Sequence, residues 1–177
     1  MTRSPKRVKV NTASYTAHPI VVLAVDTASV SGWAIRVRGK LVASGQIDTT
    51  RRGAAGVVLG RAIAHADAQQ LKLWIVLERA WGGTTNTLIG LGMARERWMS
   101  EIRCARLVSL GRVVSVMPSQ WRSGLFGSRW VRAPRDEVRA YELQYASGET
   151  KRGDIGDDEA AAICISAWAA RAARLKG

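Results

Sequence analysis

The feature that most constrains the fold is a run of six apolar residues, Ile20 to Val25, which follows Pro19 and ends in Asp26. Such a run, mostly β-branched, is typical of a strand buried on both faces in the middle of a sheet. An ionised carboxylate at the mouth of a buried strand is costly unless a positive charge meets it. An aspartate there can also be a turn residue that bonds backbone amides. On its own, this run leaves the role of Asp26 open.

A second buried strand ends in the same way. Leu73 to Leu77 are apolar and Glu78 follows them, although glutamate is a poor turn residue. If the two strands are parallel neighbours, their ends lie about 5 Å apart. Two carboxylates at that distance repel each other unless a cation lies between them. Mg²⁺ prefers such oxygen ligands, and a pair of ions can clamp the attacking and leaving oxygens of a phosphodiester. We interpret the two strand ends as a candidate metal platform.

Further acids begin the last predicted helix. Asp157, Asp158 and Glu159 precede an alanine-rich stretch that continues to Ala170. Capping and the helix dipole partly explain acids at a helix start. The alanine face would also let this helix approach the sheet closely. We therefore expect one or two of these acids to reach the carboxylates at the strand ends.

Composition limits both the size and the partners of the protein. A chain of 177 residues that is 47% hydrophobic is enough for one α/β domain, which we place at residues 20–177. Residues 1–19 are predicted to be a flexible basic arm, with or without a role in DNA contact. The net charge of +13 favours a polyanionic partner, nucleic acid before a membrane surface. No stretch is long enough to span a bilayer, and we expect a cytoplasmic protein. Cys104 and Cys164 have no metal-ligand spacing and are read as reduced core thiols.

The remaining pattern predicts how the two acidic strands are connected. Residues 33–48 alternate around a glycine turn, which indicates an antiparallel hairpin; Arg36, Arg38 and Lys40 are assigned to its solvated face. Helices are predicted at 53–70, 88–106 and 133–146, with a short strand at 113–117 and a polar loop at 149–156. Arginines alternate with Trp121, Phe126 and Trp130 between residues 119 and 139. That mixture suits a nucleic-acid backbone better than a protein core.

The order of these elements resembles the RNase H-like superfamily, and within it the RuvC family of Holliday-junction resolvases. The resemblance is carried by Asp26 with residues 27–33, Glu78, residues 91–95, Pro118 with the basic segment 127–139, and the Asp-headed last helix. It implies a central five-stranded mixed sheet, in the order 3-2-1-4-5, flanked by helices. The short basic chain is more similar to viral members of the family, which would place it in a bacterium or a virus-infected host cell.

The resemblance also implies a set of site residues. Asp26, Glu78 and Asp158 match the catalytic carboxylates, Arg135 matches a basic residue near the scissile phosphate, and Asp157 and Glu159 are metal ligands in alternative registers. The family usually has a fourth acid where this chain has Ala161. Trp81 matches an aromatic residue at the junction centre, although it can also fold back on its own loop. The predicted DNA contacts are Trp81, Arg79, Arg122, Arg129, Arg132, Arg135 and Arg139.

By the same resemblance, the protein is a homodimer that nicks two strands of a four-way DNA junction symmetrically. Two Mg²⁺ or Mn²⁺ ions per site, and no other small-molecule cofactor, would activate water and stabilise the leaving 3′-oxygen. Two alternatives stay open, and a third is excluded by length. The protein could act on flaps or forks more broadly, or bind branched DNA without cleaving it, a reading kept open by Ala161. An actin-like or sugar-kinase ATPase needs two such domains, for which the chain is too short.

Overall fold

The computed structural model describes residues 20–79, 84–106 and 113–173. The predicted arm at residues 1–19 lies outside them. Along the chain the described elements are β1 (Ile20–Asp26), β2 (Val30–Val37), β3 (Lys40–Asp48), α1 (Ala54–Ala68), β4 (Lys72–Glu78), α2 (Thr85–Cys104), β5 (Val113–Val116), α3 (Pro118–Phe126), the 3-10 helix η2 (Ser128–Val131), α4 (Arg135–Thr150) and α5 (Asp157–Ala172).

The five strands form one mixed sheet in the order β3-β2-β1-β4-β5, which confirms the predicted fold. β1 pairs antiparallel with β2, so that Asp26 lies opposite Gly32. On its other side β1 pairs in parallel with β4, with Val25 opposite Leu77. Since parallel strands end at the same edge of a sheet, this register brings Asp26 and Glu78 together as predicted.

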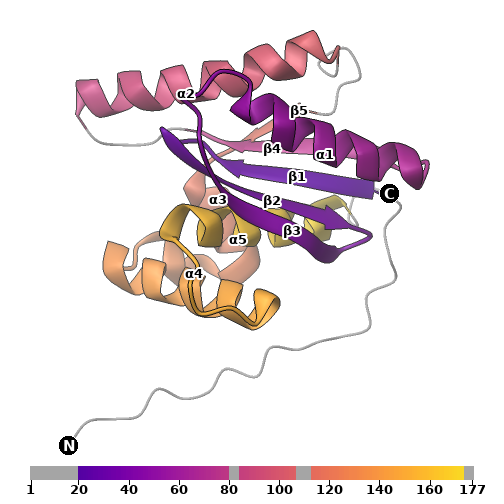
Figure 1. Ribbon diagram of the computed structural model, residues 1–177. Helices are drawn as coiled ribbons and strands as arrows, with labels where there is room; N and C mark the ends of the chain where they lie inside the picture. The colour runs from indigo at the N-terminus through magenta and orange to yellow at the C-terminus, as the bar shows by residue number, and fades with distance from the viewer. Residues whose placement is uncertain (1–19, 80–83, 107–112, 174–177) are drawn as a thin grey trace, which may run out of the picture.

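Helices cover both faces of the sheet, as Figure 1 shows: α1 and α2 lie on one face, and α3, α4 and α5 on the other. Successive residues of β1 point to opposite faces. Val21, Leu23 and Val25 pack in a cluster with residues of α1 and α2. Ile20, Val22 and Ala24 pack in another with residues of α3 and α5. The apolar run at the start of the sequence is therefore the centre of a three-layer core.

Arg36 differs from its prediction. Arg38 and Lys40 are exposed, but Arg36 is only 3% exposed and lies on the sheet face that α5 covers. Its Nε donates to Ser166 Oγ at 2.8 Å, and its Nη1 forms an ion pair with Glu149 at 3.0 Å. Burial is tolerated because hydrogen bonds and a countercharge meet the guanidinium. The solvated-face prediction is wrong for this residue.

The segment predicted to be irregular and suited to nucleic acid is largely helical, and its aromatic side chains form part of a core. Trp121 is fully buried, and its ring meets Phe126 edge-on at a centroid distance of 6.1 Å. Trp130 stacks on Tyr141 at 4.3 Å. These rings join α3 and η2 to α4, so the prediction is wrong for the aromatic side chains.

Smaller differences concern element ends and cysteines. α4 continues to Thr150, which shortens the predicted polar loop at 149–156. Cys164 is buried as predicted, whereas Cys104 is exposed; both are free thiols. Among the described residues, no helix is long and apolar enough to cross a membrane.

Candidate nuclease site

The carboxyl ends of β1 and β4 form the floor of the site. Thr27, directly after β1, donates its hydroxyl to the main-chain oxygen of Glu78 at 2.8 Å and ties the two strand ends together. The pKa of Asp26 is raised well above its ordinary value, first by burial and next by the charge and hydrogen bonding of Glu78. Two acids are thus held together at a place where ionising both is unfavourable.

Helix α5 brings a third acid to this edge. An added Cβ on Gly32 would lie 1.8 Å from the main-chain oxygen of Asp158, so the first turn of α5 rests directly on the backbone of β2. Because Gly32 is paired with Asp26, this contact also sets where Asp158 lies relative to the floor. Burial, followed by the charge of Asp157, raises the pKa of Asp158.

The structure distinguishes between the three acids at the start of α5. Asp157 and Asp158 both line the pocket, and Asp157 forms an ion pair with Arg139 at 3.4 Å. Glu159 is buried elsewhere: it accepts a hydrogen bond from Ser44 on β3 at 2.7 Å and pairs with Arg152 at 3.1 Å. Because successive helical residues are about 100° apart, Glu159 faces β3 and is not brought to Asp26 and Glu78.

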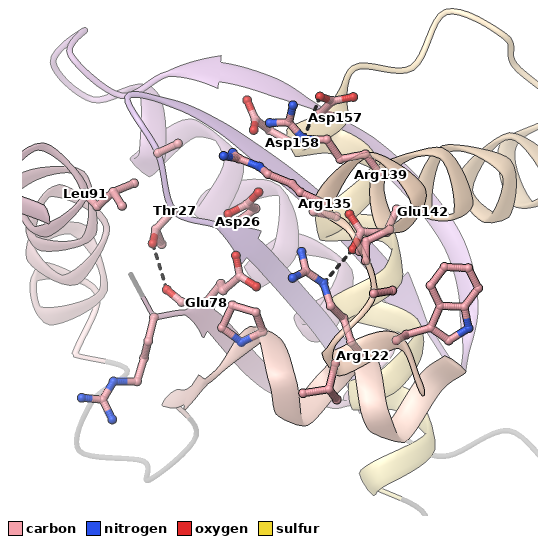
Figure 2. Close-up of a pocket in the computed structure, with 18 of the residues that line it drawn as sticks. Asp26, Thr27, Glu78, Leu91, Arg122, Arg135, Arg139, Glu142, Asp157 and Asp158 are labelled. Carbon is pink, nitrogen blue, oxygen red and sulfur yellow. Dashed lines mark hydrogen bonds and ion pairs between the residues drawn. The ribbon is translucent and has the colours of Figure 1, made fainter. Parts of the chain in front are cut away.

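The acids open into a pocket of about 520 Å³ between α2, α3, α4 and the start of α5. Figure 2 shows its carboxylates and arginines facing one another across this space. The acidic lining residues are Asp26, Glu78, Glu142, Asp157 and Asp158. The basic lining residues are Arg79, Arg122, Arg135 and Arg139. Ala161 also lines the pocket, one helical turn after Asp158. The pocket can accommodate an anion beside a carboxylate floor.

The predicted DNA-contacting arginines fall into two groups. Four of them line the pocket, as given above. Arg129 and Arg132 are exposed outside it, and the guanidinium of Arg129 lies over the Trp130 ring at 5.1 Å. Trp81 lies outside the described residues.

Two side chains at the pocket were not predicted as site residues. The indole Nε1 of Trp121 donates to Oε1 of Glu78 at 2.6 Å. Glu142 accepts from Arg122 Nε at 2.8 Å. The pKa of Glu142 is raised to about 6, first by burial, against the opposing effect of Arg122. A signal for Glu142 was present in the sequence, because it occupies the same helix stripe as the buried Val138 and Ala146. A carboxylate at a core position of a helix is rarely without a partner.

The donor chemistry fits a hard divalent cation. Asp26 and Glu78 offer carboxylate oxygens, and a cation would remove the repulsion that raises the pKa of Asp26. Within residues 20–79, 84–106 and 113–173, however, no three or more His, Cys, Asp or Glu side chains are already grouped as a metal cage. The structure therefore presents a pair of candidate ligands rather than a complete coordination shell.

Comparison with solved structures identifies the fold. No protein-family model and no curated protein sequence matches the chain. The structure resembles T. thermophilus RuvC in complex with a Holliday junction substrate, with a TM-score of 0.60 and 17% identity over 88% of this chain and 96% of that one. For Thermus thermophilus RuvC alone the TM-score is 0.59 and the identity 18%, with the same coverage. The yeast mitochondrial Holliday junction resolvase Ydc2 gives 0.51 and 13% over 92% and 85%. The chain thus has the fold of RuvC-like proteins.

Proposed function

We propose that the protein is a metal-dependent, structure-selective endonuclease that resolves four-way DNA junctions by paired, symmetric nicks. The observation that carries this proposal is the Asp26–Glu78 pair at adjacent parallel strand ends, at the floor of a pocket that four arginines line. A fold shared with junction resolvases supports it. The net charge of +13 suits a DNA substrate.

In this proposal the acids bind metal ions and the arginines bind phosphates. Asp26 and Glu78 would hold one Mg²⁺ or Mn²⁺ ion, and Asp26 with Asp158 the other. Bound there, the two ions would supply an activated water and charge stabilisation for the leaving 3′-oxygen. Arg135 and Arg122 would bind the scissile phosphate and orient it over the carboxylate floor, since guanidinium groups match phosphate geometry. Arg79 and Arg139 would contact neighbouring phosphates.

We also propose that the active form is a homodimer, because symmetric cleavage of a four-way junction needs two equivalent sites. One candidate contact surface is the exposed apolar face of α2. Leu88, Ile89 and Met93 on that face are 42%, 57% and 54% exposed. A second copy related by a two-fold axis would bury the same patch on both subunits. We propose action on DNA in the cytoplasm of a bacterium or a virus-infected host.

The test is cleavage of a labelled four-way junction against a matched linear duplex, with Mg²⁺ and with Mn²⁺. Intact protein is compared with Asp26→Asn and Glu78→Gln. Paired nicks on the junction alone, lost in both variants while junction binding persists, are the expected result. Equal cleavage of the linear duplex would contradict structure selectivity.

A second candidate is a branched-DNA-binding protein that has lost catalysis. It is favoured by the absence of a grouped metal cage among the described residues and by Ala161 in the pocket. Tight junction binding without cleavage in either metal would establish this second function. The two candidates therefore give opposite results in the same assay.

A further inference from the structure

A series of three contacts connects α4 to the Glu78 carboxylate. Glu142 on α4 holds Arg122 on α3, with 2.8 Å between the carboxylate oxygen and Nε. The Arg122 guanidinium lies over the Trp121 ring, 4.9 Å from its centroid. Trp121 in turn donates its indole N–H to Oε1 of Glu78 at 2.6 Å. Figure 2 shows the first contact as a dashed line on the side of the pocket opposite Thr27.

The last contact restricts the orientation of Glu78. The terminal torsion of a glutamate side chain is broad, so a carboxylate without a fixed partner rotates readily. An indole N–H is a donor only, and the fully buried Trp121 cannot turn away to find another acceptor. Its hydrogen bond occupies one oxygen of Glu78 and leaves the second available to a metal ion.

The other two contacts restrict Trp121 itself. The ring meets Phe126 edge-on, while Arg122 covers it with a guanidinium, an arrangement that favours a cation over an indole face. The Arg122 side chain is 29% exposed and the Glu142 side chain 4%. A buried anion therefore holds the covering cation in place. α4 braces α3, and α3 orients the acid on β4.

We propose that Trp121 is a positioning residue for the Glu78 carboxylate, and that Glu142, through Arg122, braces it from α4. This inference rests on the proposed function, since it concerns the same acid as a metal ligand. A buried indole N–H usually finds an acceptor; here the acceptor is an oxygen of a site carboxylate, so the same bond that satisfies the ring also orients Glu78. Partners that orient metal ligands typically contribute 10–100-fold to metal affinity.

The experiment measures Mn²⁺ binding to the metal-free protein by titration calorimetry in the absence of DNA. Trp121→Phe keeps an aromatic ring and removes the N–H. Trp98→Phe is the matched control, because Trp98 is also fully buried but donates to the Ser31 hydroxyl at 3.2 Å. We expect W121F to weaken Mn²⁺ binding about 10-fold or more, while W98F keeps the affinity of the intact protein even if both variants melt at lower temperature.

Glu142→Gln tests the brace, by which we mean that Glu142 holds Arg122 over the Trp121 ring. It also provides a second variant if W121F does not fold. It should weaken Mn²⁺ binding less than W121F does, and the double variant should lose less than the sum of the two effects on binding free energy. Additive effects would refute the brace, and a W121F affinity equal to that of W98F would refute the positioning role. In both cases the proposed function stands if intact protein binds Mn²⁺ and Glu78→Gln does not. Intact protein that binds no Mn²⁺ would overturn the metal site itself, and the positioning role with it.

Discussion

The contact between Gly32 and the first turn of α5 gives a prediction whose size follows from the structure. A Cβ added at Gly32 would lie 1.8 Å from the Asp158 oxygen, 2.1 Å from the Asp158 carbonyl carbon and 2.6 Å from the Glu159 nitrogen. All three atoms belong to the backbone, so no side chain can rotate to make room. Ordinary contact begins at 3.4 Å. Gly32→Ala must therefore move the start of α5 by about 1.6 Å (3.4 − 1.8), an overpacking that typically costs about 1–3 kcal/mol.

The same movement should also reduce the rate of catalysis. Displacing a catalytic group by about 1 Å can lower the rate roughly 100-fold, and Asp158 is carried on the turn that moves. Urea unfolding and junction cleavage are measured for G32A and for Gly60→Ala. Gly60 lies within α1 with no atom within 4 Å of an added Cβ, so G60A should stabilise the protein by about 1 kcal/mol and leave cleavage unchanged. If G32A were as stable and active as intact protein, α5 would not rest on β2 as described.

Three further predictions concern buried charges. Burial, followed by the charge of Glu78, raises the pKa of Asp26 in the folded protein. Asp26 therefore contributes to stability at low pH, and this contribution is lost as pH rises through the folded pKa. Because Asn carries no charge, Asp26→Asn should raise the melting temperature of metal-free protein at neutral pH. Glu149→Gln, which leaves the buried Arg36 guanidinium without its countercharge, should cost about 3 kcal/mol in urea unfolding. Arg36→Met should cost less, because the partner that it leaves unpaired, Glu149, has a side chain that is 30% exposed. The pKa of Glu142 rises from 4.5 to about 6, so this group alone should lower stability by about 2 kcal/mol as pH increases across that interval. Because the pKa of Asp26 is raised as well, the test compares the two proteins, and a pH dependence of stability equal in Glu142→Gln and intact protein would contradict this assignment.

The sheet could be predicted because its signals are local. Runs of apolar residues that end in Asp26 and Glu78 already contain the strand identity, the burial and the edge at which the acids meet. The parallel pairing of β1 with β4 followed from the helix between them. The sequence could not decide which acid of α5 faces the floor, because that depends on the rotation of the helix, which its contact with Gly32 determines.

The errors concern side chains whose partners are distant in sequence. Arg36 is buried against Glu149 and Ser166, more than a hundred residues away, so alternation along its own strand could not reveal the countercharge. Trp121 looked like a nucleic-acid contact because arginines surround it in sequence. Its partners, including Glu78, become visible only when α3 is placed against the sheet.

The distribution of the acids along the chain also bears on when the pocket exists. Asp26 and Glu78 lie on strands completed by residue 78, but Asp158 belongs to the last helix. A nascent or prematurely terminated chain that stops before residue 157 thus lacks the third acid. It also lacks Ile163 and Ile165 of α5, which pack in the core against β2 and β1, so we expect such a chain to be neither folded nor active during synthesis. For the same reason, we expect both pieces of a chain divided in the loop between α4 and α5 to be inactive on their own.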